Sequence, residues 1–432
     1  MTLNVPVWLS RAAFCCVLVL TLLAGLSGGG LTADGLLVLR TFTLVGVACW
    51  LLSALHGDPP GGLPRWPLLA LGALLAWSLL SALLSPAPWP SLAACADSLL
   101  WLLAALLGSA VVNTPQRRHV WLLTLLHGAA LLAVYGAVQF LGHGWTPRLT
   151  PARVSSLYFN SNHYAGLLAL VLPVALVLAL ETVGWRRWAA LALTLLLAAN
   201  LLWSFSWAGL FVLAVCTVLL VRRLWRGRPL GFRLLNVSLG VGIAALLAAA
   251  ALELSPQLAP GGWSARASEL RQTWVQQSLG SRQLIWQGAV QIARTSPLVG
   301  AGPGQFESAF ALYRSPVHRS FSEAISHSEV NYAHSDFLQA ASETGLPGLL
   351  ALFTFWALAL RWGRGLLAAA LRPGLVALLL YGLTDCNLTE IPGNALLAYM
   401  MAGVLIGTGT GVGTRVPSGS STGAAPSPVP PT

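Results

Sequence analysis

The sequence predicts an all-α integral membrane protein with about 12 transmembrane helices and one long, partly helical loop outside the cytoplasm, between spans 9 and 10. Two observations predict this fold class. Hydrophobic residues make up 56% of the 432 residues and charged residues only 9%, whereas a soluble domain carries about 25% charged residues. The apolar residues also gather in runs close to the roughly 20 residues that a helix needs to cross a bilayer.

The apolar runs give the expected spans in order. Their approximate limits are 10–28, 36–55, 66–86, 92–112, 120–141, 163–182, 187–205, 208–221, 235–254, 345–361, 372–386 and 394–411. The chain is thereby divided into spans 1–9 in residues 1–254, a polar loop over 255–344, spans 10–12 in residues 345–412 and a tail over 413–432. The tail is rich in Gly, Ser, Pro and Thr, so it is expected to be a disordered cytoplasmic segment.

Arginine placement predicts which side of the membrane each loop faces. All 24 basic residues are arginine, and the net charge is +11. Short cytoplasmic loops carry an excess of positive charge, and a cytoplasmic N-terminus puts most loop arginines on that side. These arginines are Arg65, Arg117, Arg118, Arg186, Arg187, Arg222, Arg223, Arg226, Arg228, Arg233, Arg361, Arg364 and Arg372. The short outer loops then hold only Arg148 and Arg153, and the long loop 255–344 faces outward.

Two other function classes are excluded by the same composition. A pI near 10 can indicate nucleic-acid binding, but these arginines lie in short loops between apolar runs, so no nucleic-acid partner is expected. The six cysteines form no CxxC pair, which argues against a disulfide framework or a cysteine metal site.

Polar chemistry is concentrated in the loop 255–344. Residues 281–295 have an apolar face and are followed by a proline, which predicts a helix. A glycine-rich turn at 300–304 comes next. A second helix is expected from about 331 to 343, ending at Gly345.

Four segments carry a resemblance to a known family. They are FNSNHYAG at 159–166, RQLIW at 282–286 with SPLVGAGPGQF at 296–306, AHSDFLQ at 333–339 with ETGLPG at 343–348, and GLTDCNL at 382–388 with IPGN at 391–394. In this order and spacing, over about residues 150–410, they resemble the O-antigen ligase family, which includes many O-antigen and exopolysaccharide polymerases. The N-terminal spans match only in hydropathy.

The resemblance implies an inverting membrane glycosyltransferase of the bacterial inner membrane, with the long loop in the periplasm. Such an enzyme takes a glycan from an undecaprenyl-pyrophosphate-linked oligosaccharide donor and transfers it to an acceptor hydroxyl. The acceptor is another lipid-linked glycan for a polymerase, or the lipid A core for a ligase. The pattern at 385–394 favours a polymerase. The resemblance implies no cofactor, no metal and no nucleotide sugar, and a chain-length regulator is a candidate partner besides membrane lipids.

Arginine is the expected ligand of the donor's pyrophosphate, because it stays charged and binds phosphate oxygens bidentately. Arg282 lies in the first turn of its predicted helix, where the helix dipole also favours an anion, so it is expected to take part in catalysis. The candidates for a second cation are Arg153, Arg314 and Arg319. The alternative for Arg282 is a solvated loop arginine, or an ion pair with Glu269 or Asp336.

One position departs from the family pattern. Near the junction of the seventh and eighth spans the family usually has Ser-Arg-Gly, whereas this chain reads SFSWAG at 204–209, with Trp207 where arginine is expected. Either the chain supplies that positive charge elsewhere, or the alignment of this stretch is shifted.

His334 is the candidate catalytic base, since histidine can take a proton from the attacking hydroxyl near neutral pH. Glu323 or Glu329 is expected to orient it, because Asp336 is too close along the predicted helix to face the same way. His327, seven residues earlier, could share the face and bind substrate. The alternative is a structural histidine at a loop–helix junction. A zinc site formed by His318, His327 and His334 is not expected, since no HExxH motif or compact ligand pair exists.

Three polar residues near span ends complete the predicted site. Asp385 could bind acceptor hydroxyls or form a structural ion pair with an arginine, since a lone carboxylate in lipid is costly. Asn160 and Asn162 could bind sugar or cap the sixth span.

Asp34, Arg40 and Asp97 are expected in interhelical pairs.

Two functions from other classes compete with the glycosyltransferase. A flippase or transporter of lipid-linked glycan would show related halves and a polar site at the membrane midplane, but the polar residues here cluster outside. A structural membrane subunit would not need the ordered motifs of the loop.

Overall fold

The computed structural model describes residues 5–56, 63–144, 153–206, 208–225, 280–313 and 330–409. All regular structure in these ranges is helical, which confirms the predicted all-α class. The helices are α1 (Val5–Leu26), α2 (Ala33–Leu55), α3 (Arg65–Leu84), α4 (Pro88–Val111), α5 (Pro115–Phe140), α6 (Ser161–Glu181), α7 (Trp185–Trp203), α8 (Gly209–Trp225), α11 (Gly280–Thr295), α12 (Phe306–Tyr313), α14 (Asp336–Arg361), α15 (Gly365–Tyr381) and α16 (Pro392–Gly407).

Seven of the described helices are long and apolar enough to cross a membrane, and three shorter apolar helices accompany them. Their outer faces carry exposed leucines, among them Leu37, Leu83, Leu131 and Leu350. An apolar exterior of this kind suits lipid rather than water. The chain is therefore a multi-pass membrane protein.

The first eight predicted spans coincide with α1–α8 to within a few residues. The ninth, 235–254, lies outside the described residues, as do the parts of the long loop at 255–279 and 314–329 and the tail 413–432. In the loop, the predicted helix 281–295 is α11, which begins one residue earlier.

The helix predicted at 331–343 differs at its start. Residues 330–335 are not helical, and α14 begins at Asp336 with Ser335 as N-cap, its side chain accepting a hydrogen bond from the Leu338 amide. The expected break at Gly345 is present, because Gly345 adopts φ 68° and interrupts the helical backbone. His334 therefore precedes the helix instead of lying in it.

The span predicted at 372–386 is displaced. The helix α15 covers Gly365–Tyr381, so Arg372 lies inside it and Asp385 lies in the loop that follows. The start was predicted too late because Arg372 was counted among the arginines of a cytoplasmic loop. The Arg372 guanidinium is satisfied by the carbonyls of Leu360, Trp362 and Gly363 at the end of α14.

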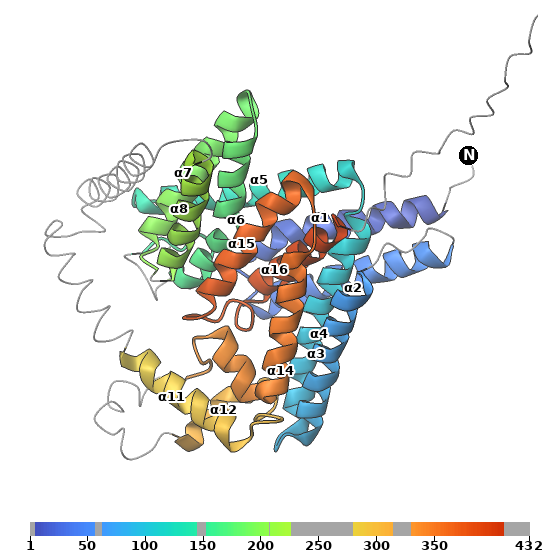
Figure 1. Cartoon of the computed structure of the whole chain (residues 1–432), viewed down its shortest axis with the longest axis vertical. Coiled ribbons are helices and arrows are strands. Elements are labelled where there is room, and N and C mark those ends of the chain that lie inside the picture. The colour runs from blue at the N-terminus through green and yellow to red at the C-terminus, as the bar shows by residue number, and fades with distance from the viewer. Residues whose placement is uncertain are drawn as a thin grey trace, which may run out of the picture.

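Helix α16 is the centre of the bundle, buried from Gly393 to Gly407 and packed against α1, α4, α6, α14 and α15. In Figure 1 it lies in the middle, with α7 and α8 on one flank, α3 and α4 on the other, and α11 and α12 at one end. Glycines allow the closest approaches: a Cβ on Gly403 would collide with the Ala105 carbonyl, and one on Gly108 with that of Met400. Small residues at helix contacts are typical of membrane bundles.

The two ends of the bundle differ in character. At one end Arg117 donates to Ser10 Oγ and Arg118 to the Gly407 carbonyl, so the two arginines at the start of α5 lie beside α1 and the end of α16. At the other end the 300–304 turn is held by α3, where Ser85 Oγ donates to the Ala301 carbonyl. Between them Arg40 of α2 pairs with Asp97 of α4 at 2.5 Å, which is one of the predicted interhelical pairs.

Candidate functional site

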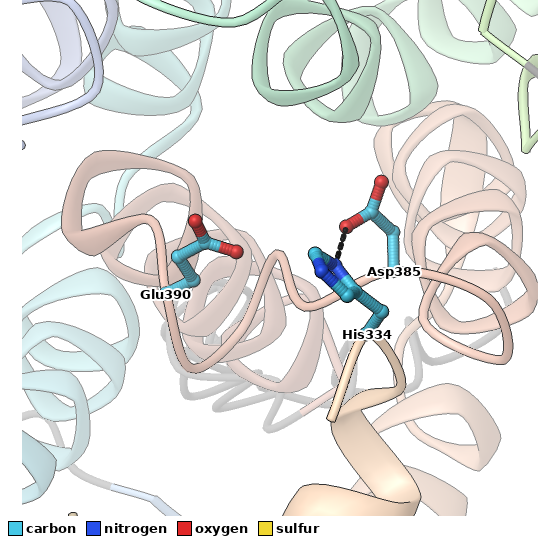
Figure 2. Close-up of side chains that lie close together, drawn as sticks. All are labelled: His334, Asp385 and Glu390. Atoms are coloured by element: carbon cyan, nitrogen blue, oxygen red, sulfur yellow. Dashed lines mark ion pairs between the residues drawn. The ribbon is translucent and has the colours of Figure 1, made fainter. Parts of the chain in front are cut away.

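Three segments far apart in the sequence bring Arg282, His334 and Asp385 together. Arg282 lies in the first turn of α11, and Asp385 lies in the loop between α15 and α16. His334 directly precedes Ser335, the N-cap of α14. Arg282 Nη2 lies 3.5 Å from Asp385 Oδ2, and His334 Nδ1 lies 3.6 Å from Asp385 Oδ1 (Figure 2). Arg282 and Asp385 are buried, whereas the His334 side chain is 38% exposed. The imidazole is thus the most accessible of the three groups.

The backbone around His334 holds the ring in this position. His334 has φ 47°, in the left-handed region that non-glycine residues rarely adopt. Its carbonyl accepts a hydrogen bond from Trp286 Nε1 of α11 at 3.4 Å. The next amide, of Ser335, donates to Cys386 Sγ. Contacts from two other segments therefore fix an unfavourable conformation, which is common at functional sites.

Asp336 organises the loop that carries Asp385. Its Oδ2 accepts a hydrogen bond from the backbone N–H of Asn387. Its Oδ1 accepts from the backbone N–H groups of Leu388 and Thr389 and from the Thr389 hydroxyl, and all four distances are 2.7–3.2 Å. The Asp336 amide in turn donates to the Gly382 carbonyl. Asp336 was expected to face away from His334, and the structure gives it a separate task, which is to fix the 382–391 loop.

Asp385 keeps its negative charge in this setting. Burial, the largest influence, favours the protonated form of a carboxyl group. The contact with His334 and the charge of Arg282 outweigh it and lower the pKa of Asp385 to about 2. A fixed carboxylate beside the ring can orient the imidazole and stabilise the imidazolium that forms when the ring takes up a proton. Glu323 and Glu329, which were expected in this role, lie outside the described residues.

A second pair, not predicted from the sequence, lies beside this site. His163 Nε2 of α6 is 3.2 Å from Glu390 Oε1, in the loop before α16. Figure 2 shows the His334 ring between the carboxylates of Asp385 and Glu390. One signal was available: Glu390 is a carboxylate in a short turn between two apolar runs, where a buried charge needs a partner. Its partner could not be identified, because His163 is more than 200 residues away along the chain.

Arg153, Asn160 and Asn162 gather at the start of α6. Asn160 is the N-cap, its side chain accepting from the Asn162 amide. Arg153 donates to Asn162 Oδ1 at 2.7 Å and to the carbonyls of Ser204 and Phe205. Arg153 thus ties the segment before α6 to the turn between α7 and α8.

Tyr381 connects this arginine to the rest of the site. Its hydroxyl donates to the Asn162 carbonyl and pairs with Ser206 Oγ at 2.8 Å. The same hydroxyl lies within electrostatic range of Asp385, Arg282 and Arg153. Arg153 and Arg282, the two described arginines of the predicted site, therefore both lie near the Tyr381 hydroxyl.

The remaining predicted residues are not placed. Arg314, Arg319, His318 and His327 lie outside the described residues, and so does Trp207.

His334, Asp385 and Glu390 are also a conceivable donor set for a cation. Their ligand atoms lie within 4.8 Å of one another, and imidazole and carboxylate are ligands that divalent metals accept. Each carboxylate already faces a basic side chain, Arg282 for Asp385 and His163 for Glu390. These partners reduce the need for a metal charge at this place.

Comparison with known proteins finds a family match for part of the chain. Residues 192–353 match the O-antigen ligase family. A search of curated proteins finds no significant match to the chain. The matched segment contains Arg282 and His334, and it supports an O-antigen ligase or polymerase type of function, acting on a lipid-linked glycan donor and an acceptor, rather than a flippase. The chain is a multi-pass membrane protein whose residues 192–353 match the O-antigen ligase family.

Proposed function

We propose that the protein is an inverting, metal-independent polysaccharide polymerase of the bacterial inner membrane. It would transfer an undecaprenyl-pyrophosphate-linked glycan to a hydroxyl of another lipid-linked glycan at the outer face. The observation that carries this proposal is the His334–Asp385–Arg282 arrangement, in which an accessible imidazole is backed by a buried, ionised carboxylate. Transfer to the lipid A core, as a ligase, is the alternative within the same chemistry.

His334 is proposed as the base. The acceptor oxygen attacks the anomeric carbon and forms the new glycosidic bond, while its proton passes to the imidazole. The bond from the anomeric carbon to the pyrophosphate oxygen breaks, and that oxygen keeps the electron pair. Asp385 stabilises the resulting imidazolium. The 3.6 Å separation from His334 Nδ1 is loose, as is common for catalytic contacts in the absence of substrate.

Arg282 is proposed to bind the pyrophosphate. Its contact with Asp385, at 3.5 Å, is longer than the 2.7–2.9 Å typical of a strong charge-assisted hydrogen bond. A guanidinium has five N–H donors, so Asp385 can hold it in place while other donors face the leaving group. A preorganised cation at the developing charge lowers the barrier by several kcal/mol. Arg153 is the proposed second cation among the described residues.

One assay tests the proposal. Purified protein in lipid nanodiscs receives lipid-linked glycan extracted from producing cells, either alone or with lipid A core. A polymerase yields a ladder of lengthened glycans from the extract alone, whereas a ligase yields product only with lipid A core. Transfer is expected to be unchanged in EDTA, and loss of transfer in EDTA, restored by a divalent cation, would contradict metal independence. The absence of transfer to either acceptor would refute the glycosyltransferase.

A further inference from the structure

The His163–Glu390 pair is not used by the chemistry proposed above. Both side chains are largely buried, with exposed fractions of 10% and 16%. Glu390 Oε2 and His163 Nδ1 are buried atoms without a hydrogen-bond partner among the described residues. Buried polar atoms in native proteins are nearly always paired, so two unpaired atoms in one ion pair need an explanation.

A purely structural role does not explain them. The connection between α6 and the loop before α16 is already made by Asn394, whose amide donates to the His163 carbonyl and to Asn387 Oδ1 at 2.9 and 2.8 Å. The Asn394 oxygen accepts from the Tyr158 hydroxyl. The backbone around the pair is thus fixed without any contribution from the Glu390 carboxylate.

The position of Glu390 relative to His334 indicates a ligand. Ligand atoms of His334, Asp385 and Glu390 lie within 4.8 Å of one another. Figure 2 shows a carboxylate oxygen of Glu390 directed toward His334, from the side opposite Asp385. Since Asp385 is paired with Arg282, a nitrogen of the imidazole and the Glu390 carboxylate remain, of these three described side chains, as acceptors for a substrate.

These two acceptors fit a pair of hydroxyls better than a single one. A hydroxyl has one proton, so it cannot donate to both the imidazole and the carboxylate. Two hydroxyls on neighbouring carbons of a sugar ring can each donate to one of these acceptors. The acceptor atoms lie within 4.8 Å of each other, and each hydroxyl needs an acceptor about 2.7–2.8 Å away. The attacking hydroxyl would face His334 and its neighbour would face Glu390.

We propose that Glu390 is an acceptor-binding residue that takes the hydroxyl adjacent to the attacking one, with His163 as its positioning residue. The acceptor is then a sugar whose attacking hydroxyl is part of a vicinal diol. This inference rests on the proposed function, since it assumes that an acceptor hydroxyl attacks beside His334.

Direct binding of an acceptor that cannot act as donor tests the inference. Mild acid releases the glycan from the lipid-linked extract, and the released glycan has no pyrophosphate leaving group. Its binding to full-length protein in nanodiscs is measured by calorimetry, in EDTA. Glu390→Gln keeps the shape but removes the charge, so affinity should fall about 10-fold or more. His163→Ala should give a smaller loss. Glu307→Gln makes the same chemical change on the exposed face of α12 and should bind as wild type does.

Binding of the intact lipid-linked donor reports on folding of the variants and should persist in Glu390→Gln. Equal affinities of wild type and Glu390→Gln for the released glycan would overturn the inference. So would a wild-type protein that binds the glycan only when a divalent cation replaces EDTA, because a cation would then be the partner of Glu390.

A second arm uses only the wild-type protein. Periodate followed by borohydride opens vicinal diols, and the treated glycan should bind about as weakly as the untreated glycan binds to Glu390→Gln. Undiminished binding of the treated glycan would refute the diol. The transfer assay with the wild-type protein separates the two proposals. Active wild-type transfer together with equal glycan binding by Glu390→Gln rejects only the role of Glu390, whereas absent transfer by the wild-type protein rejects the glycosyltransferase.

Discussion

At the scale of single residues, the imidazole of His334 is the group on which the proposed proton transfer depends. We expect His334→Ala to lower the transfer rate by about 10²–10⁴-fold, the usual contribution of a general base, while the protein still inserts and accumulates. The rate is measured with purified variant and saturating lipid-linked donor. His127→Ala, a change on the exposed face of α5, is the control. A rate for His334→Ala within a few-fold of wild type would remove His334 from the mechanism.

Arg282 can be tested by separating its charge from its shape. Arg282→Ala should abolish most donor binding and leave Asp385 as a buried carboxylate without its arginine. Arg282→Lys should restore only part of the activity, because lysine keeps the charge but loses the planar fork that binds two phosphate oxygens. Donor KM and kcat are measured for both variants. If both substitutions left transfer near the wild-type level, the pyrophosphate would have to bind elsewhere.

At the scale of elements, the start of α14 and the loop between α15 and α16 form one unit through Asp336. In Asp336→Asn an amide N–H₂ would replace one oxygen, and in the orientation that keeps the Leu388 and Thr389 contacts it would face the Asn387 N–H, donor against donor. The lost hydrogen bonds and the unpaired donors should lower the free energy of unfolding by about 1–3 kcal/mol and reduce transfer by displacing Asp385. Thermal unfolding in detergent and the transfer assay measure the two effects.

Thr389→Val is the matched comparison for Asp336→Asn, since it removes one hydrogen bond to the same side chain and leaves both of its oxygens in place. It should be the milder of the two. Equal effects of the two substitutions would show that the backbone hydrogen bonds to Asp336 do not organise the loop.

The elements also show how far the sequence could be used. Span existence was predictable because lipid requires about 20 apolar residues and internally satisfied backbone groups. The start of α15 was not, because Arg372 is satisfied by carbonyls of another helix. The meeting of His334 with Asp385, and of His163 with Glu390, depends on helix packing that no local pattern encodes. The left-handed backbone of His334 likewise results from contacts with α11 and the 382–391 loop.

At the scale of the whole molecule, Arg118 lies beside Gly407 at the end of α16, whereas the charged site lies beside the start of the same helix. From the positive-inside rule we expect the site to face outward. Alkaline phosphatase, which is active only outside the cytoplasm, should be active when fused at Gly280 and inactive when fused at Gly363. A cytoplasmic reporter that is active at Gly280 would contradict the orientation and the outward-facing site.

The burial of α16 has a consequence for biosynthesis. Its residues from Gly393 to Gly407 are enclosed by α1, α4, α6, α14 and α15, yet it is the last of the described helices to leave the ribosome. The earlier helices therefore enter the bilayer before the helix that they enclose, so their final packing has to wait until α16 inserts. A ribosome that stalls before Pro392 would leave a bundle without its axis, a natural substrate for membrane proteases.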